Sequence, residues 1–223
     1  MPPNKRLQLT PNSSFESIRG TVLAAGAVSQ RWRSALLGAA EPPVRWAASV
    51  GAMYEVDEHD SVVELRDVPQ SDVGAPLPAV VAAEHHLDLL YLVSEPDPNW
   101  DGTYVNVVGP DSEGELVARI RFERPYAHMF GPPNDEAFSG HPLASRGLSS
   151  YAAWEVRDSS WIRTLERMNS VHPYHDPSRF ELLRHFIFAF HDTTFECIAW
   201  RYKAHLERGS IASVATALPG FWA

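Results

Sequence analysis

The sequence predicts an α+β fold in which an antiparallel, curved sheet is packed by two or three short helices. Segments after residue 52 mostly alternate apolar and polar residues with a period of two, which is typical of strands that bury one face. Loops rich in Gly, Pro, Asp and Ser join these segments, which favours hairpins and therefore antiparallel pairing. Helical spacing after good capping residues is confined to brief stretches, so the helices are expected to be short.

The first expected strands lie at 61–67 (SVVELRD), 86–94 (HLDLLYLVS) and 103–108 (TYVNVV). The segment 115–123 alternates most clearly. One of its faces is apolar and the other is charged: Leu116, Ala118, Ile120 and Phe122 against Arg119, Arg121 and Glu123. A turn-rich loop that begins at Gly109 separates the last two segments, so we expect 103–108 and 115–123 to form a hairpin.

A further strand is expected at 151–157, followed by two short helices. Ser159 or Ser160 can cap a helix that runs through Asn169. Three apolar residues fall at helical spacing on it: Trp161, Leu165 and Met168. The pair Asp176-Pro177 predicts the second helix start, because a capping acceptor is followed by proline at the first helical position. Two residues of this second helix are expected to point inward: Phe180 and Leu183.

The segment 184–202 predicts a central hairpin, because Phe186, Phe188 and Phe190 share one strand face. The sequence His191-Asp192-Thr193-Thr194 is typical of a turn. A symmetric turn there pairs residues whose numbers sum to 385, with three apolar pairs: Phe190 with Phe195, Phe188 with Cys197, and Phe186 with Ala199. Cys197 is then a buried small hydrophobe rather than a nucleophile. The tail, 203–223, is expected to be helical at first.

Residues 1–52 differ in composition from the rest of the chain. All ten histidines and all aspartates lie after residue 52, and prolines interrupt the first 52 residues. We expect 1–52 to be a poorly structured leader that need not belong to the natural domain, and 53–223 to form a single α+β domain. The alternative is a helix at 29–40 that docks on the domain through an apolar face of Trp32, Leu36 and Leu37.

Charge and cysteine content narrow the class of partner. The formal charge is −9, with six basic and two acidic residues in 1–52 and thirteen basic and twenty-six acidic residues in 53–223. An acidic domain repels phosphate backbones, so no nucleic-acid partner is expected. No apolar run approaches the length of a bilayer, so no membrane partner is expected. The single Cys197 fits a reducing compartment, and we expect a cytoplasmic protein.

The segment 128–147 (HMFGPPNDEAFSGHPLASRG) is the first candidate site, because it is expected to be a polar loop between two strands. Its candidate ligand-binding residues are His128, Asn134, Asp135, Glu136 and His141. The structural alternative is that Asn134 caps a short helix whose first turn holds Asp135 and Glu136. Ser139 lacks the strand–turn–helix context of a catalytic serine.

The second candidate is the segment His172-Pro173-Tyr174-His175-Asp176, in which His172 and His175 are candidate ligand-binding residues. Two histidines and a carboxylate within five residues are compatible with part of a metal site. A complete site needs a third ligand that the sequence does not place, and Asp176 is already expected to cap a helix.

Several stretches between Phe130 and Tyr202 resemble a family of uncharacterised bacterial proteins. They are GPPNDE from Gly131, GHPL from Gly140, SWIR from Ser160, ERMN from Glu166, HP at His172 and FHDTTFEC from Phe190. The resemblance implies that this part of the chain is one unit, and it implies no activity. The opening NKRLQLTPNS resembles leaders from translated integron-cassette recombination sites and concerns gene context alone.

Two functions follow as expectations. The first is a non-catalytic module that binds a small molecule or a protein, with no cofactor. The alternative is a small, metal-assisted, hydrolase-like enzyme in which His141, His172 and His175 converge with Asp135 or Asp176. That enzyme requires at least three of these groups within metal-bond or hydrogen-bond reach.

Overall fold

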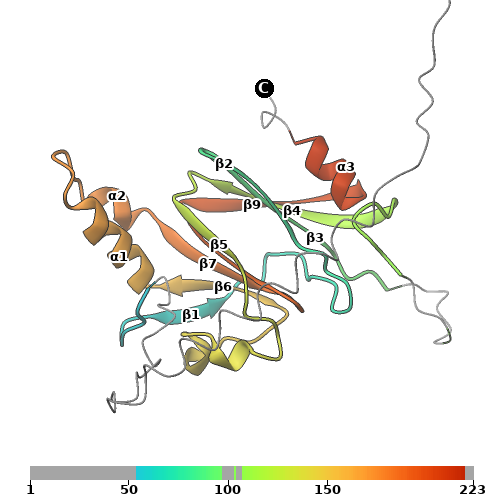
Figure 1. The fold of residues 1–223 in the computed structure, drawn as a ribbon, viewed down its shortest axis with the longest axis horizontal. Helices are drawn as coiled ribbons and strands as arrows, with labels where there is room; N and C mark the ends of the chain where they lie inside the picture. The colour runs from blue at the N-terminus through green and yellow to red at the C-terminus, as the bar shows by residue number, and fades with distance from the viewer. Residues whose placement is uncertain (1–53, 97–102, 104–106, 219–223) are drawn as a thin grey trace, which may run out of the picture. The chain divides into compact units, whose positions relative to one another are not determined.

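The structure is a computed structural model that describes residues 54–96, 103 and 107–218 (Figure 1). The expected leader at 1–52 and its alternative helix lie outside the described residues. Within them the fold is α+β with antiparallel sheets and short helices, as predicted. The strands are β1 (Ser61–Glu64), β2 (Ala79–Ala83), β3 (His86–Leu92), β4 (Glu115–Glu123), β5 (Ala127–Gly131), β6 (Ala152–Arg157), β7 (Arg184–Ala189), β8 (Thr194–Ala199) and β9 (Arg201–Gly209). The helices are α1 (Ser160–Asn169), α2 (Ser178–Glu181) and α3 (Ile211–Thr216), with 3-10 turns at Phe138–Gly140 and Ala144–Arg146.

The strands form two sheets, one of order β1-β6-β7-β8-β5 and one of order β2-β3-β4-β9. Among the described residues the chain passes between the sheets from β1 to β2, from β4 to β5 and from β8 to β9, and the last two passages are neighbours. Trp200 alone separates β8 from β9, and its backbone N–H donates to the carbonyl of Glu123 at the end of β4. From Glu123 the chain continues through Arg124 into β5, so both crossings meet at one corner of the molecule.

The main core lies between the two sheets. Phe122 from β4 contacts Phe186, Phe188 and Phe195, with ring centroids 5.5–6.0 Å apart. The alternation that predicted this face of 115–123 is therefore confirmed, because Ala118, Ile120 and Phe122 are buried. The predicted burial of Phe186, Phe188 and Phe190 is confirmed as well.

The predicted register of the β7–β8 hairpin is wrong by two residues. Phe188 lies opposite Phe195, and Phe186 lies opposite Cys197. The backbone N–H of Phe190 donates to the carbonyl of Thr193 at 2.9 Å, so the turn centres on His191 and Asp192. A shift of two leaves each side chain on its original face, and for this reason the burial of Cys197 was predicted correctly.

Several other predictions of secondary structure and exposure are wrong. β4 pairs with β3 on one side and β9 on the other, so it does not form the expected hairpin with 103–108, part of which lies outside the described residues. Residues 201–209 form β9 rather than a helix, and β2 was not predicted. His128 lies in β5 rather than in a loop. Met168 is 68% exposed, because it lies on the solvent side of α1.

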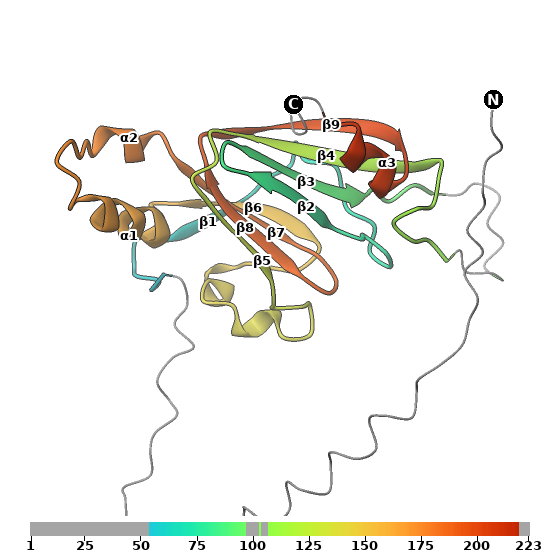
Figure 2. The same ribbon diagram turned by 45° about the horizontal axis from the view of Figure 1, so that its top comes forward.

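The outer face of each sheet is covered by a different set of helices. Figures 1 and 2 show α1 and α2 beside the β1–β6–β7 end of one sheet, and α3 beside the other sheet. Ile211 and Val214 of α3 pack with Leu90, Leu92 and Val117. Within the part of the chain that the structure describes, no helix is long and apolar enough to cross a membrane.

Candidate functional site

A carboxylate is buried on the helix-covered face of the first sheet. Glu196 of β8 is 8% exposed and accepts three hydrogen bonds. Its Oε1 lies 3.0 Å from His141 Nε2, and its Oε2 lies 2.9 Å from His185 Nε2. The Tyr54 hydroxyl donates to the same Oε2 at 2.7 Å. These donors satisfy a charge that would otherwise be costly to bury.

Contacts around this carboxylate lower the pKa of Glu196 and raise the pKa of Tyr54. Burial favours the neutral form of Glu196, but the hydrogen bonds and charge interactions with His141 and His185 outweigh it and lower the pKa of Glu196 to about 2. Burial and the neighbouring Glu196 raise the pKa of Tyr54 far above its usual value. Glu196 is therefore ionised at neutral pH, and Tyr54 keeps its proton as a donor.

The partners of each ring fix where the proton of a neutral histidine lies. An ionised carboxylate can only accept, so Nε2 of both His141 and His185 must carry a hydrogen. His141 Nδ1 then accepts from the backbone N–H of Leu143 at 3.1 Å. His185 Nδ1 lies 2.9 Å from Ser159 Oγ, so in the neutral ring it accepts from that hydroxyl. The result is a continuous chain of hydrogen bonds from Ser159 through His185 to Glu196.

Ser159 lies at the sharp turn between β6 and α1. The preceding Asp158 has φ +51°, in the left-handed region that residues other than glycine adopt uncommonly. Ser159 is the N-cap of α1, and its Oγ accepts from the backbone N–H of Ile162 at 3.3 Å. The hydroxyl is thus held by an acceptor, His185 Nδ1, and a donor, the Ile162 amide.

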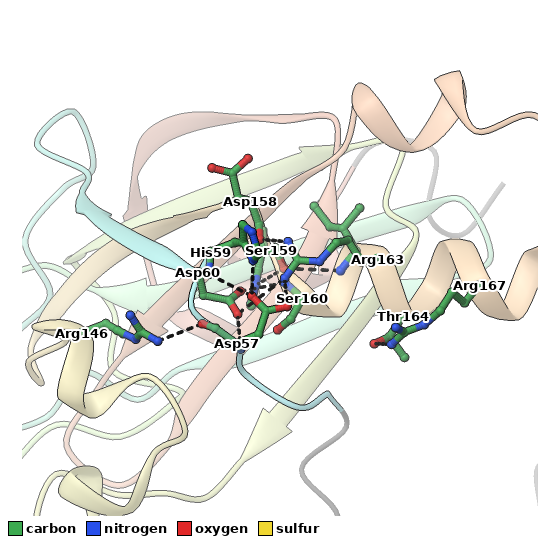
Figure 3. A network of polar contacts seen from close by, with 12 residues as sticks. Asp57, His59, Asp60, Arg146, Asp158, Ser159, Ser160, Arg163, Thr164 and Arg167 are labelled. Carbon is green, nitrogen blue, oxygen red and sulfur yellow. Dashed lines mark hydrogen bonds and ion pairs between the residues drawn. The ribbon is translucent and has the colours of Figure 1, made fainter.

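A second polar network fixes this helix start (Figure 3). Asp60 Oδ1 accepts from the backbone N–H of Ser160 at 2.7 Å, and Asp60 Oδ2 accepts from that of Asp57 at 2.9 Å. The Arg163 guanidinium donates to Asp57 Oδ2 and to the carbonyl of Asp158. Segments 57–60 and 158–163 are therefore tied together around Ser159.

A cleft of about 610 Å³ opens where these elements meet, and we call it the α1–α2 cleft. Its described lining includes Ser159 with Val156, Ile162, Arg163, Phe180 and Leu183. This volume lies within the range of small-molecule sites, about 300–1,000 Å³. Ser159 is buried, but it lies on the wall of the cleft, unlike His185 and Glu196 behind it.

A second cleft, of about 580 Å³, lies at the corner where the chain crosses between the sheets, and we call it the corner cleft. Its apolar lining includes Tyr126, Phe180, Leu182 and Trp200. Leu182 is 56% exposed and Tyr126 is 47% exposed. The guanidinium of Arg124 lies over the Trp200 ring, with Cζ 4.9 Å from the ring centroid, which is a cation–π contact.

The charged groups of the corner cleft all have one sign. Among the described residues that line it, the ionisable bases are His85, Arg124 and Arg179, and none is an aspartate or glutamate. Arg179 Nε lies 3.6 Å from Asp176 Oδ2 in an exposed ion pair, which contributes little to stability. The other N–H groups of the Arg179 guanidinium can still donate to a ligand. The described lining of the corner cleft is therefore basic and partly apolar.

The structure separates the seven residues predicted to bind a ligand. His141 joins Glu196 inside the protein, and His128 is exposed on β5. Asn134 Oδ1 accepts from the backbone N–H of Ala137 at 3.1 Å, but it does not cap a helix as expected. The 3-10 turn begins at Phe138 with Ala137 as its N-cap, so Asp135 and Glu136 precede it, and Glu136 is exposed. His172 is exposed after α1, and His175 lies 3.0 Å from Asn169 Oδ1.

Asp135 belongs to a different, partly exposed cluster. Its Oδ2 accepts from the Tyr151 hydroxyl and lies 3.0 Å from His191 Nδ1. The hydrogen bond from Tyr151 and the contact with His191 lower the pKa of Asp135 and, reciprocally, Asp135 raises the pKa of His191 and raises that of Tyr151 to about 12. Tyr151 has φ +58°, a strained conformation for an aromatic residue.

The residues proposed for a metal-assisted enzyme are thus divided among separate places. His141 contacts Glu196, Asp135 contacts His191, and Asp176 accepts from the backbone N–H of Ser178 at 3.1 Å. In the described ranges, no group of three or more His, Cys, Asp or Glu residues is arranged to hold a metal ion. Burial raises the pKa of the Cys197 thiol well above its usual value, which disfavours the thiolate.

Sequence reasoning missed Ser159, His185, Glu196 and the corner cleft as sites. Ser159 was identified only as a helix cap, and Glu196 stands among apolar residues in FECIA, which is the one local signal that a charge is buried there. Comparisons with protein families, with curated proteins and with solved structures give no match for this chain.

Proposed function

We propose that this protein binds a small amphipathic anion, such as a medium-chain carboxylate, in the corner cleft. The observation that carries the proposal is the pairing of an apolar, partly exposed lining with charged groups of positive sign only. Small-molecule sites are typically apolar clefts with a few well-placed polar groups.

The apolar part of the ligand is expected to contact Leu182, Tyr126 and Phe180. Leu182 and Tyr126 expose about half of their surface to water, so covering them with a hydrocarbon chain is favourable by about 25 cal/mol per Å² buried. Phe180 contacts Tyr126 edge-on, with ring centroids 5.4 Å apart, and makes the wall between this cleft and the α1–α2 cleft.

The anionic group is expected to bind Arg124. Its backbone has φ +50° at the crossing between the sheets, and its guanidinium is held over Trp200. A guanidinium presents donors in a planar fork that matches a carboxylate. Arg179 also lines the cleft and supplies a second positive charge.

Isothermal titration with decanoate and with decylamine tests the proposal, because the two probes share a chain and differ in charge. We expect decanoate to bind more tightly. Arg124→Gln is expected to weaken decanoate binding by about tenfold, since a charge-assisted hydrogen bond contributes about 1.5 kcal/mol at a partly exposed site.

Arg66→Gln is the matched control, because Arg66 is exposed and lies outside the corner cleft. It is expected to leave decanoate binding unchanged. Equal binding of the two probes, or decanoate binding that is indifferent to Arg124→Gln, contradicts the proposal.

A further inference from the structure

We infer that Ser159 is a nucleophile for acyl transfer from small carboxylic esters, with His185 as its general base and Glu196 as the group that orients and stabilises the imidazole. The inference concerns the α1–α2 cleft and does not depend on anion binding in the corner cleft.

The geometry is that of a nucleophile, a general base and a carboxylate in series. Ser159 Oγ lies 2.9 Å from His185 Nδ1, and His185 Nε2 lies 2.9 Å from Glu196 Oε2. Such a chain is recognised by the roles and distances of its members rather than by their order in the sequence. Here the base uses Nδ1 toward the serine and Nε2 toward the carboxylate.

The carboxylate is prepared for its role before any substrate binds. It is buried, it accepts from Tyr54 and His141 as well as from His185, and these bonds hold it in one orientation. Tyr54 stacks on Trp161 with ring centroids 5.4 Å apart, and Trp161 meets the His185 ring edge-on at 5.1 Å. The imidazole is therefore fixed by packing against Trp161 and by hydrogen bonds at both nitrogens.

The position of the serine in the chain also fits a nucleophile. It follows β6 and a residue with positive φ, and it precedes the first turn of α1, so it lies at a sharp strand–turn–helix junction. It is the member of the series that lines the α1–α2 cleft, whose lining combines apolar residues such as Ile162 and Leu183 with charged residues.

The reaction conserves atoms and charge. Ser159 Oγ attacks the ester carbonyl carbon while its proton passes to His185 Nδ1, and the Glu196 carboxylate stabilises the imidazolium. The tetrahedral intermediate then breaks its bond to the alcohol oxygen, which takes the proton from His185 and leaves an acyl group on Ser159. Water then attacks the acyl carbon while His185 Nδ1 takes a proton from it. The bond to Ser159 Oγ breaks, Oγ takes that proton from His185, and the carboxylic acid leaves.

The test is covalent labelling of the folded full-length chain with two serine-directed probes, a fluorophosphonate and the smaller phenylmethylsulfonyl fluoride, followed by peptide mass spectrometry. We expect an adduct on Ser159. His185→Gln is expected to slow labelling by roughly 100-fold or more, since a general base contributes at least that factor.

Two further variants separate catalysis from structure. Ser159→Asn keeps a good N-cap acceptor, so it is expected to retain the fold, shown by an unchanged near-ultraviolet circular dichroism spectrum, and to lose the adduct. Ser139→Ala, at an exposed serine in a 3-10 turn, is expected to label as the unmodified chain does. Absence of a Ser159 adduct with both probes, or a labelling rate unchanged in a folded His185→Gln, overturns the inference.

Discussion

Replacing Glu196 by glutamine tests whether the buried carboxylate stabilises the fold as a charged group. The amide keeps the size of the side chain but offers only one acceptor oxygen to Tyr54, His141 and His185. A donor that loses its partner inside the protein costs about 1–3 kcal/mol. We therefore expect Glu196→Gln to be less stable than the unmodified chain at pH 7.

The shift in the pKa of Glu196 gives a separate value for the stability that its charged form contributes. The pKa of Glu196 is lowered from 4.5 to about 2, which corresponds to about 3 kcal/mol of stability. Because the folded-state pKa is the lower one, this contribution is present above pH 4.5 and is lost as the pH falls toward 2. About 2 kcal/mol of it is expected to disappear between pH 6 and pH 3.

The assay is urea-induced unfolding at pH 6 and pH 3, monitored by tryptophan fluorescence. The free energy of unfolding of the unmodified chain is expected to fall between these pH values by about 2 kcal/mol more than that of Glu196→Gln. Glu84→Gln, which changes an exposed carboxylate, is the control and is expected to follow the unmodified chain. Equal acid sensitivity of the unmodified chain and Glu196→Gln refutes the reasoning.

The other predictions concern packing and the partly exposed cluster. Phe188→Ala is expected to lower the free energy of unfolding by about 3–5 kcal/mol, because Phe188 is buried among Phe122, Phe195 and Tyr91. Met168→Ala, at an exposed position, is expected to change it by less than about 0.5 kcal/mol. Equal effects of the two substitutions in urea unfolding contradict the core described above. The pKa of His191, followed by its NMR titration, is expected to lie above 6.5 and to fall in Asp135→Asn, because Asp135 raises it. The stability that this pair contributes is present where Asp135 is ionised and His191 is protonated. It is lost as the pH rises through the pKa of His191 and as it falls through the pKa of Asp135, and an unaltered titration in the variant rules the pairing out.

Period-two alternation predicted the strands that have one buried face, and β4 was predicted with its observed bounds. The same pattern cannot distinguish registers that differ by two residues, because both keep every side chain on its face. This is why the β7–β8 pairing was wrong although its buried residues were right. β9 was missed because it is an edge strand whose many charged residues resemble a solvent-exposed helix.

The candidate sites could be predicted only in fragments, because their parts are far apart in the sequence. The donors to Glu196 lie 11, 55 and 142 residues away, and no local spacing connects them. His141 was identified as a candidate, but as part of a loop site rather than as a partner of a buried carboxylate. Arg124 and Trp200 come together because the chain crosses between the sheets twice at one corner, and this follows from topology.

A crystal structure of the protein with decanoate most directly tests the claim that the corner cleft is a binding site for anions. We predict the carboxylate within hydrogen-bond distance of the Arg124 guanidinium and the hydrocarbon chain against Leu182 and Tyr126. A structure with decanoate bound elsewhere, or with its carboxylate pointing away from Arg124 into solvent, contradicts that claim.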